Sequence, residues 1–482
     1  MVSMPAPSIG ARLDRLPRSR HVWWTVILLS LGGVFEYYDL FFTGYVAPGM
    51  VKAGMFEPAS LGPLGFLATM GLKGIGSFVF ATFAGLFVGT MLLGSAADKF
   101  GRRQIFIFAL LWYSLANIVL ACQQSGFGID LWRFVSGIGL GIELVTIDTY
   151  IAELIPARDR GRAFALSSFI TFLAVPLVAL LAWLLVPQQP FGVEGWRIVV
   201  LIGSVGALAA YGFQRAVPES PRWLARHGRY DEADRIVGRI EAAVERETGR
   251  TLPPPLPGLD DTVAKGDFAE IWSPAYRGRT LMLSVFHFFQ TVGFYGFANW
   301  VPTLLIAKGI LVTRSLEWSF IIAVVNPLGP LLAMTIADRF ERKWQICAAA
   351  TGIGVFGLLF AGADQAMLLI PLGMAVTLSN NWMSYAFHNY QAELFPTRIR
   401  ARAVGFVYGW SRLSGAFAGL AIDYLLNASG VPAVFTFIGF AMLMVVLSIG
   451  IFGPRTRNLA LEEIAAQPGA QLPVAGLRVP AD

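Results

Sequence analysis

Charged residues are scarce in this sequence. Asp, Glu, Lys and Arg make up 14% of its 482 residues, against about a quarter in soluble domains, and 55% of the residues are hydrophobic. Such a composition excludes an ordinary soluble domain. The net charge of +6 does not predict nucleic-acid binding either, because the basic residues form short clusters between apolar runs and not one surface patch.

Cysteine is almost absent as well. Cys122 and Cys347 lie far apart in separate apolar runs, which excludes a disulfide framework and gives no metal-ligand spacing, so we expect them to pack as small apolar side chains. The sequence also offers no constellation of nucleophile and base. We therefore expect neither an enzyme nor a cofactor. A cleavable signal peptide is not expected, because the first apolar run is too long and follows a basic arm.

The hydrophobic residues are gathered into long runs. A helix needs about 20 apolar residues to cross the hydrocarbon core of a bilayer. Twelve runs approach this length, near 23–47, 74–96, 103–122, 127–151, 162–187, 196–214, 279–306, 316–337, 344–362, 366–391, 402–427 and 431–453. The sequence therefore predicts an all-α polytopic membrane protein with twelve transmembrane helices in two six-helix bundles, embedded in a lipid bilayer as a monomer.

A charged break separates the two sets of runs, and its first part, 230–250, has the pattern of an amphipathic helix. The expected organisation is an arm (1–22), an N-terminal bundle (23–214), a linker (215–278), a C-terminal bundle (279–453) and a tail (454–482). Basic clusters occupy the arm, the linker, the tail and alternate loops. By the positive-inside rule these parts and both termini are cytoplasmic, which requires an even number of spans.

The two bundles share an internal repeat. The segment from Tyr150 to Ala163 matches the segment from Tyr390 to Ala403 at nine of fourteen positions, and Ala97–Arg103 matches Ala337–Lys343 at four of seven. Both matches have the same offset of 240 residues. Parallel repeats of this kind are how alternating-access carriers place a binding site between two rocking halves.

Within this repeat, several motifs resemble those of the major facilitator superfamily. Gly94-Ser-Ala-Ala-Asp-Lys-Phe-Gly-Arg-Arg103 is similar to the signature between helices two and three, and the Glu153 and Glu393 segments are similar to the companion motifs after helices four and ten. Pro218-Glu-Ser-Pro-Arg-Trp-Leu224 resembles the sugar-porter and organic-ion branch. The resemblance covers nearly the whole chain and implies a transporter of a small molecule.

These motifs predict a cytoplasmic latch in each half. Asp98 is expected to accept hydrogen bonds at the start of a neighbouring helix while arginines pair with Glu153, and such pairs would break when the gate opens. The expected gating residues are Asp98, Arg102, Arg103, Glu153, Arg160, Asp338, Arg342, Glu393 and Arg400. The alternative is that the arginines only fix the topology.

Ionisable side chains inside the apolar runs are costly to bury and indicate function. Glu36 and Asp39 are three residues apart and share one helix face. Glu36-Tyr-Tyr-Asp39 resembles the first-helix site of proton-coupled sugar porters, and Arg133-Phe-Val-Ser-Gly-Ile-Gly-Leu-Gly141 resembles the helix-four run whose arginine pairs with that aspartate. The resemblance implies Asp39 as the proton carrier, Arg133 as its switchable partner and Glu36 as a neighbour in proton coupling. A permanent structural ion pair is the alternative, and the glycines are expected to allow close helix packing.

Arg412 is the main candidate for substrate contact, because a guanidinium inside a span can hold a carboxylate through two hydrogen bonds. Glu143 or Asp148 could neutralise it instead. The remaining expected substrate-binding residues are polar or aromatic: His388, Gln290, Tyr295, Tyr385 and Asn299.

The pocket departs from the sugar-porter pattern. Val175 stands where that family has a glutamine, Tyr295 replaces an asparagine and His388 replaces a tryptophan. A sugar hydroxyl left without a partner in a buried site costs about 1–3 kcal/mol. We therefore expect proton-coupled symport of a small organic anion, a carboxylate, across a bacterial inner membrane. The alternatives are a sugar or polyol porter, an organic-cation carrier or drug exporter, and a transceptor without flux.

Overall fold

A computed structural model describes residues 8–57, 62, 74–93, 96–214, 217–255, 267–336 and 339–456, and within these ranges every regular element is a helix. Nine helical segments of this part are long and apolar enough to cross a membrane. Two shorter apolar segments, Ile75–Met91 and Gly195–Leu208, add one crossing each. The last long segment bends at Gly430, which has a φ of +75° and precedes Pro432, so it holds two crossings. The twelve expected helices are therefore present.

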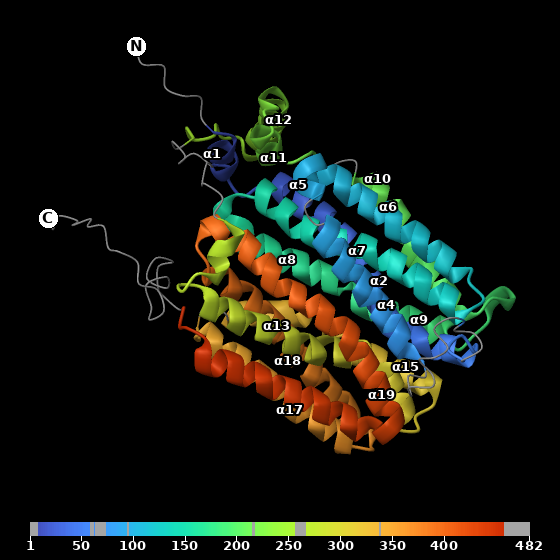
Figure 1. The fold of residues 1–482 in the computed structure, drawn as a ribbon. Helices are drawn as coiled ribbons and strands as arrows, with labels where there is room; N and C mark the ends of the chain where they lie inside the picture. The colour runs from blue at the N-terminus through green and yellow to red at the C-terminus, as the bar shows by residue number, and fades with distance from the viewer. Residues whose placement is uncertain are drawn as a thin grey trace, which may run out of the picture.

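In the N-terminal half the crossings are built from the following elements: α2 (Arg20–Lys52), α4 (Ile75–Val88) with the π-helical η2 (Gly89–Leu93), α6 (Arg102–Ala121), α7 (Gly126–Leu154), α8 (Arg160–Phe172) with α9 (Ala174–Leu185), and α10 (Gly195–Gln214). The C-terminal half uses α13 (Arg277–Ala298) with α14 (Val301–Ala307), α15 (Val312–Ala323) with α16 (Leu328–Ile336), α17 (Arg342–Gly362), α18 (Ala366–Glu393) and α19 (Thr397–Phe452). Figure 1 shows the blue-to-green first half beside the yellow-to-red second half.

The halves touch along two seams, α4 against α19 and α9 against α15. Trp183 of α9 stacks on Phe320 of α15 with ring centroids 5.8 Å apart. Gly44 of α2 lies so close to the backbone of Asn299 that a Cβ there would be 2.2 Å from the Asn299 carbonyl oxygen. Close approach at these points brings side chains of the two halves together at the centre of the bundle.

The glycines that follow Arg133 serve helix packing. A Cβ on Gly137 would lie 2.6 Å from the Thr82 carbonyl oxygen, and one on Gly141 would lie 2.4 Å from that of Leu86. Both contacts are with α4, whereas Gly139 faces Trp112 of α6. Small residues let α7 lie against both neighbours, as the sequence predicted.

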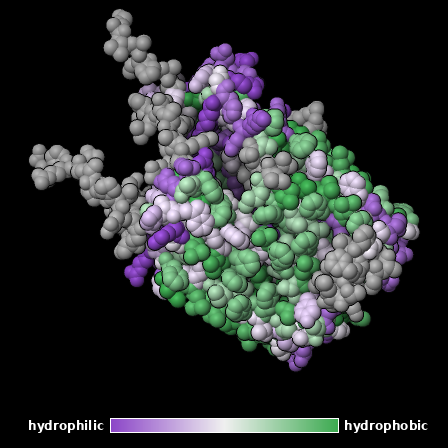
Figure 2. Space-filling model, viewed as in Figure 1, coloured by the Kyte–Doolittle hydropathy of each residue, from purple (hydrophilic) through white to green (hydrophobic). Residues whose placement is uncertain are grey.

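Hydrophobic side chains cover the middle of the face seen in Figure 2, while hydrophilic ones gather over α1 (Ile9–Asp14), α11 (Pro221–Arg226) and α12 (Tyr230–Thr248). We call the end of the bundle that carries these three helices the linker end, and the opposite one the far end. The amphipathic helix expected over 230–250 is present as α12. The arm, expected to end at residue 22, passes into α2 at Arg20.

The arm is fastened to the linker by ion pairs. Arg12 contacts Asp234 and Glu241 of α12, and Arg15 donates to Glu241 at 2.6 Å. Burial opposes ionisation of Glu241, but the hydrogen bonds from Arg12 and Arg15 outweigh it and hold the pKa of this carboxyl below its ordinary value of 4.5. A lowered pKa means that the contact stabilises the docked arm fully above pH 4.5 and is lost as the pH falls below the folded-state pKa.

Replacing Glu241 by Gln is therefore expected to undock the arm at pH 7. Hydrogen bonds to a charged group contribute about 1.5–3 kcal/mol each, so trypsin cleavage after the arm's arginines should become at least about tenfold faster. Glu232→Gln is the control, because Glu232 lies on the same helix and forms its ion pair with Arg229 and not with the arm. Equal cleavage rates for the two variants would contradict the docking role of Glu241.

Candidate functional site

Asp39 and Arg133 form a buried ion pair inside the N-terminal half. Both are at most 2% exposed. The second carboxylate oxygen of Asp39 accepts hydrogen bonds from Asn117 at 2.7 Å and from Ser136 at 3.2 Å. Three donor side chains from α6 and α7 thus surround this carboxylate of α2.

Arg133 is held just as completely. Its guanidinium donates to the Asp39 carbonyl oxygen and to Thr43 at 2.8 Å each, and to Thr82 at 2.9 Å. The ring of Phe42 lies 4.4 Å from the guanidinium carbon. The Arg133 side chain cannot move away without breaking its contacts to both α2 and α4. Its position therefore depends on how these two helices are arranged.

A second group of ionisable side chains lies where the two halves meet. Glu36 interacts electrostatically with Arg412 of α19, Asp148 of α7 and Asp39. Arg412 is 2% exposed, lies over the ring of Tyr408 at 4.8 Å and interacts with Tyr295 of α13. No ion pair joins Arg412 to any carboxylate of the described residues.

Asp148 and His388 occupy equivalent positions in the repeat, 240 residues apart. Both side chains are exposed, although each lies five residues before a glutamate at the linker end, Glu153 for Asp148 and Glu393 for His388. Asp148 interacts with Glu36, and His388 interacts with Arg412. These two side chains therefore face the space between the halves on its linker side.

The other expected substrate-binding residues are distributed more widely. Gln290 is buried and donates to Thr291 at 2.9 Å, and Tyr385 is half-buried in α18. Glu143 is fully buried behind Glu36, within the N-terminal half. Asn299 is fully buried at the end of α13, and neither its amide nitrogen nor its amide oxygen has a hydrogen-bond partner among the residues that the structure describes.

The space on the far side of this group is small. A cavity of about 20 Å³, room for about one water molecule, is lined by both halves, including Tyr45, Phe294, Asn326, Asn380 and Asn381. Asn381 donates to the side chain of Asn326 at 3.2 Å. Together with the contact of Gly44 and Asn299, this packing closes the far end over the centre.

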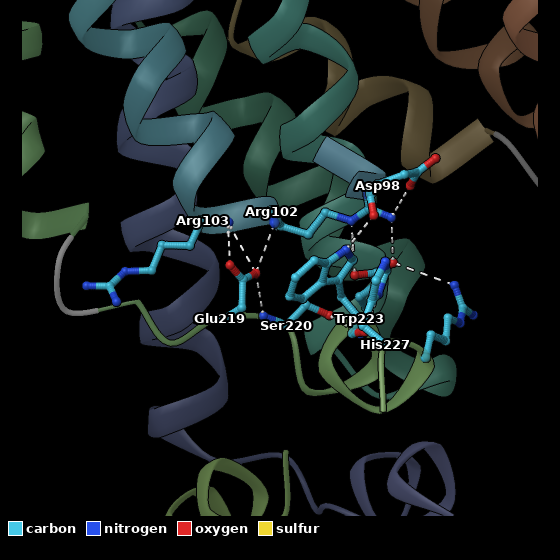
Figure 3. Close-up of polar contacts among 9 residues, drawn as sticks. Asp98, Arg102, Arg103, Glu219, Ser220, Trp223 and His227 are labelled. Carbon is cyan, nitrogen blue, oxygen red and sulfur yellow. Dashed lines mark hydrogen bonds and ion pairs between the residues drawn. The ribbon is translucent and has the colours of Figure 1, made fainter. Parts of the chain in front are cut away.

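Several residues of the expected latch lie together at the linker end of the N-terminal half, with Glu219 as an additional acidic residue (Figure 3). Arg102 contacts Asp98 at 2.6 Å and Glu153 at 3.1 Å. The capping role expected of Asp98 belongs to Glu219, which accepts from the backbone nitrogens of Arg102 and Arg103 at 3.0 and 3.2 Å. A carboxylate is favourable there because the first amides of a helix lack partners.

Trp223 of α11 completes this cluster by donating to the Asp98 carbonyl oxygen at 2.8 Å. All of these contacts lie within one half and its linker. The hydrogen bonds of Glu219 and Trp223 therefore hold the beginning of the linker against the segment that leads into α6.

The second half repeats part of the latch. Arg342 forms an ion pair with Glu393. Arg160 and Arg400, which are equivalent in the repeat, donate to the carbonyl oxygens five residues before them at 3.3 and 3.1 Å. Asp338 lies outside the described residues.

A family profile described as "Sugar (and other) transporter" matches residues 25–467. The chain belongs to this family. It is therefore an integral membrane transporter of the major facilitator superfamily and not an enzyme.

Individual members of the sugar (and other) transporter family agree with this assignment. The putative metabolite transport protein YyaJ of Bacillus subtilis (strain 168) is 31% identical over 453 residues, covering 94% of this chain and 96% of the relative. The niacin transporter NiaP of Acinetobacter baylyi is 28% identical, covering 94% and 99%. The partially occluded inward-open structure of the xylose transporter XylE from E. coli superposes with a TM-score of 0.72 at 20% identity, over 91% of this chain and 99% of that one.

The sequence interpretation did not identify several residues that contact the predicted site and latch residues of this transporter. Asn117 and Ser136 complete the Asp39 site, and Glu219 with Trp223 complete the latch. Ser136 could have been predicted, because it lies one helical turn after Arg133 and therefore on the same helix face. Glu219 lies in the Pro218–Leu224 motif, which indicated the branch of the superfamily without showing what the glutamate contacts.

Proposed function

We propose that this transporter carries a small organic anion, a carboxylate with an apolar or aromatic body, together with protons. The observation that carries the proposal is the buried Arg412 guanidinium at the junction of the halves, which has no ion-pair partner among the described residues. A buried cation requires compensation, and a substrate carboxylate can supply it through two parallel hydrogen bonds. Tyr408, Tyr295 and Tyr37 surround the guanidinium and offer rings for the body of the substrate.

Asp39 and Arg133 are assigned the coupling role. Arg133, Asn117 and Ser136 all donate to the Asp39 carboxylate in this conformation. Movement of α6 or α7 against α2 would withdraw these donors, and a buried carboxylate without a neighbouring cation binds a proton more readily. Protonation is thereby linked to the arrangement of the helices.

A sugar or polyol is the second candidate substrate. The asparagines around the small cavity favour it, since Asn326, Asn380 and Asn381 can hydrogen-bond to hydroxyl groups. The relative named a niacin transporter favours a carboxylate, since niacin is a pyridine carboxylic acid. We assign the linker end to the cytoplasm of a bacterial cell, where the positive-inside rule places the basic clusters.

Uptake into proteoliposomes under an inward proton gradient tests the proposal. The panel contains nicotinate, benzoate, lactate, xylose, glucose and choline, each measured with and without an uncoupler. Gradient-driven accumulation of a carboxylate, and not of the sugars or choline, is expected. Accumulation of a sugar or of choline alone would overturn the anion assignment, and the absence of any flux would favour a transceptor.

A further inference from the structure

The acidic residues at the centre outnumber the basic ones. Three buried carboxylates, Glu36, Asp39 and Glu143, face two buried guanidinium groups, Arg133 and Arg412. Arg133 is committed to Asp39. Arg412 is left to balance Glu36 and Glu143, so one negative charge would remain uncompensated if both were ionised.

Glu143 is the more isolated member of this pair. It is 0% exposed, and no described cation lies within ion-pair distance of it. The Tyr113 hydroxyl of α6 approaches Glu143, but neither carboxylate oxygen has a hydrogen bond of good geometry. Isolated buried carboxylates are too costly to keep ionised, so the pair holds one proton in this conformation.

Glu36 connects the pair to the substrate position. Glu36 interacts electrostatically both with Glu143 and with Arg412, and one of its carboxylate oxygens has no hydrogen-bond partner among the described residues. The other titratable groups that interact with the pair are Asp39 and Tyr37 of α2, Asp148 of α7, Tyr113 of α6 and Tyr295 of α13. Among the described residues, Arg412 is the cation that interacts with Glu36 across the junction of the two halves.

We infer that Glu36 and Glu143 form a second proton-binding site, which holds one proton in the empty transporter and two when an anion occupies Arg412. The substrate carboxylate replaces Glu36 as the counter-charge of Arg412, and the displaced Glu36 then takes up a proton from the aqueous side that Asp148 faces. This inference rests on the proposed function. With the proton of Asp39, it predicts that two protons accompany each monocarboxylate, so that each cycle moves one net positive charge.

The test is accumulation driven by voltage alone. Proteoliposomes with equal pH on both sides receive a potassium diffusion potential, inside negative, and the monocarboxylate of the panel that the wild type accumulates. Transport with two protons concentrates the anion about tenfold for each ~59 mV, whereas transport with one proton is electroneutral and concentrates nothing. We expect voltage-driven accumulation by the wild type and its loss in Glu36→Gln/Glu143→Gln, with pH-driven accumulation retained through Asp39.

Asp130→Asn is the matched control, because Asp130 is a buried carboxyl of α7, is 3% exposed, and lies beside Ser77, away from Arg412. Counterflow exchange of labelled substrate, which needs no net proton movement, shows that the double variant folds and binds. Voltage-driven accumulation that persists in an exchanging double variant would overturn the second site, as would an electroneutral wild type. If the wild type accumulates no carboxylate under any gradient, the proposed function fails and this inference fails with it.

Discussion

Asp39→Asn is expected to remove one coupled proton, lowering the ratio of internal to external substrate by about tenfold for each pH unit of the imposed gradient. An amide cannot bind and release the coupling proton. It also leaves Arg133 buried without a counter-charge, which typically costs about 3–5 kcal/mol of stability. The measurement is pH-driven uptake beside counterflow exchange, and exchange should survive while the accumulation ratio falls.

The double variant Asp39→Asn/Arg133→Gln separates coupling from structure. Removing both charges avoids the unpaired guanidinium, so its thermal stability should recover towards that of the wild type. Accumulation should stay below that of the wild type by the same factor, because the Asp39 proton site is still missing. If the double variant accumulates substrate like the wild type, Asp39 and Arg133 are a permanent structural pair.

The helices of this fold could be predicted because the bilayer imposes one rule on all of them. Every backbone polar group within the membrane needs a partner, so long apolar runs become helices whatever their neighbours are. The break between the last two crossings could also be predicted, because Gly430 and Pro432 interrupt the apolar run at that point. Sequence alone could not show that η2 is π-helical, because the register of its hydrogen bonds depends on packing against α7.

The central site could be predicted only in part. Charges such as Asp39, Arg133 and Arg412 stand out because an apolar run tolerates few of them. Their partners do not stand out, because Asn117 and Ser136 are ordinary polar residues whose role depends on the positions of α6 and α7. Glu143 illustrates the same limit. Its position in the sequence suggested a side chain that lines the substrate cavity, whereas in the structure it is buried and interacts with Tyr113 and Glu36.

Arg412→Lys is expected to raise the KM for the transported carboxylate by about tenfold to a hundredfold, with a smaller effect on the maximal rate. Lysine keeps the charge but presents a point charge in place of the planar fork that grips a carboxylate with two bonds. Losing one hydrogen bond to a charged group costs about 1.5–3 kcal/mol, and each 1.4 kcal/mol is tenfold in affinity. The KM is measured from initial rates of pH-driven uptake.

Arg314→Lys is the control, because Arg314 lies on α15 at the protein surface and pairs with Glu317 at 2.7 Å. Its KM should match that of the wild type. A carrier of sugars or of cations would respond differently to Arg412→Lys, since neither substrate uses a guanidinium to hold a carboxylate. Uptake that is insensitive to Arg412→Lys would therefore move the assignment to the hydroxyl-binding asparagines around the small cavity, while the fold and the Asp39 coupling site would remain as proposed.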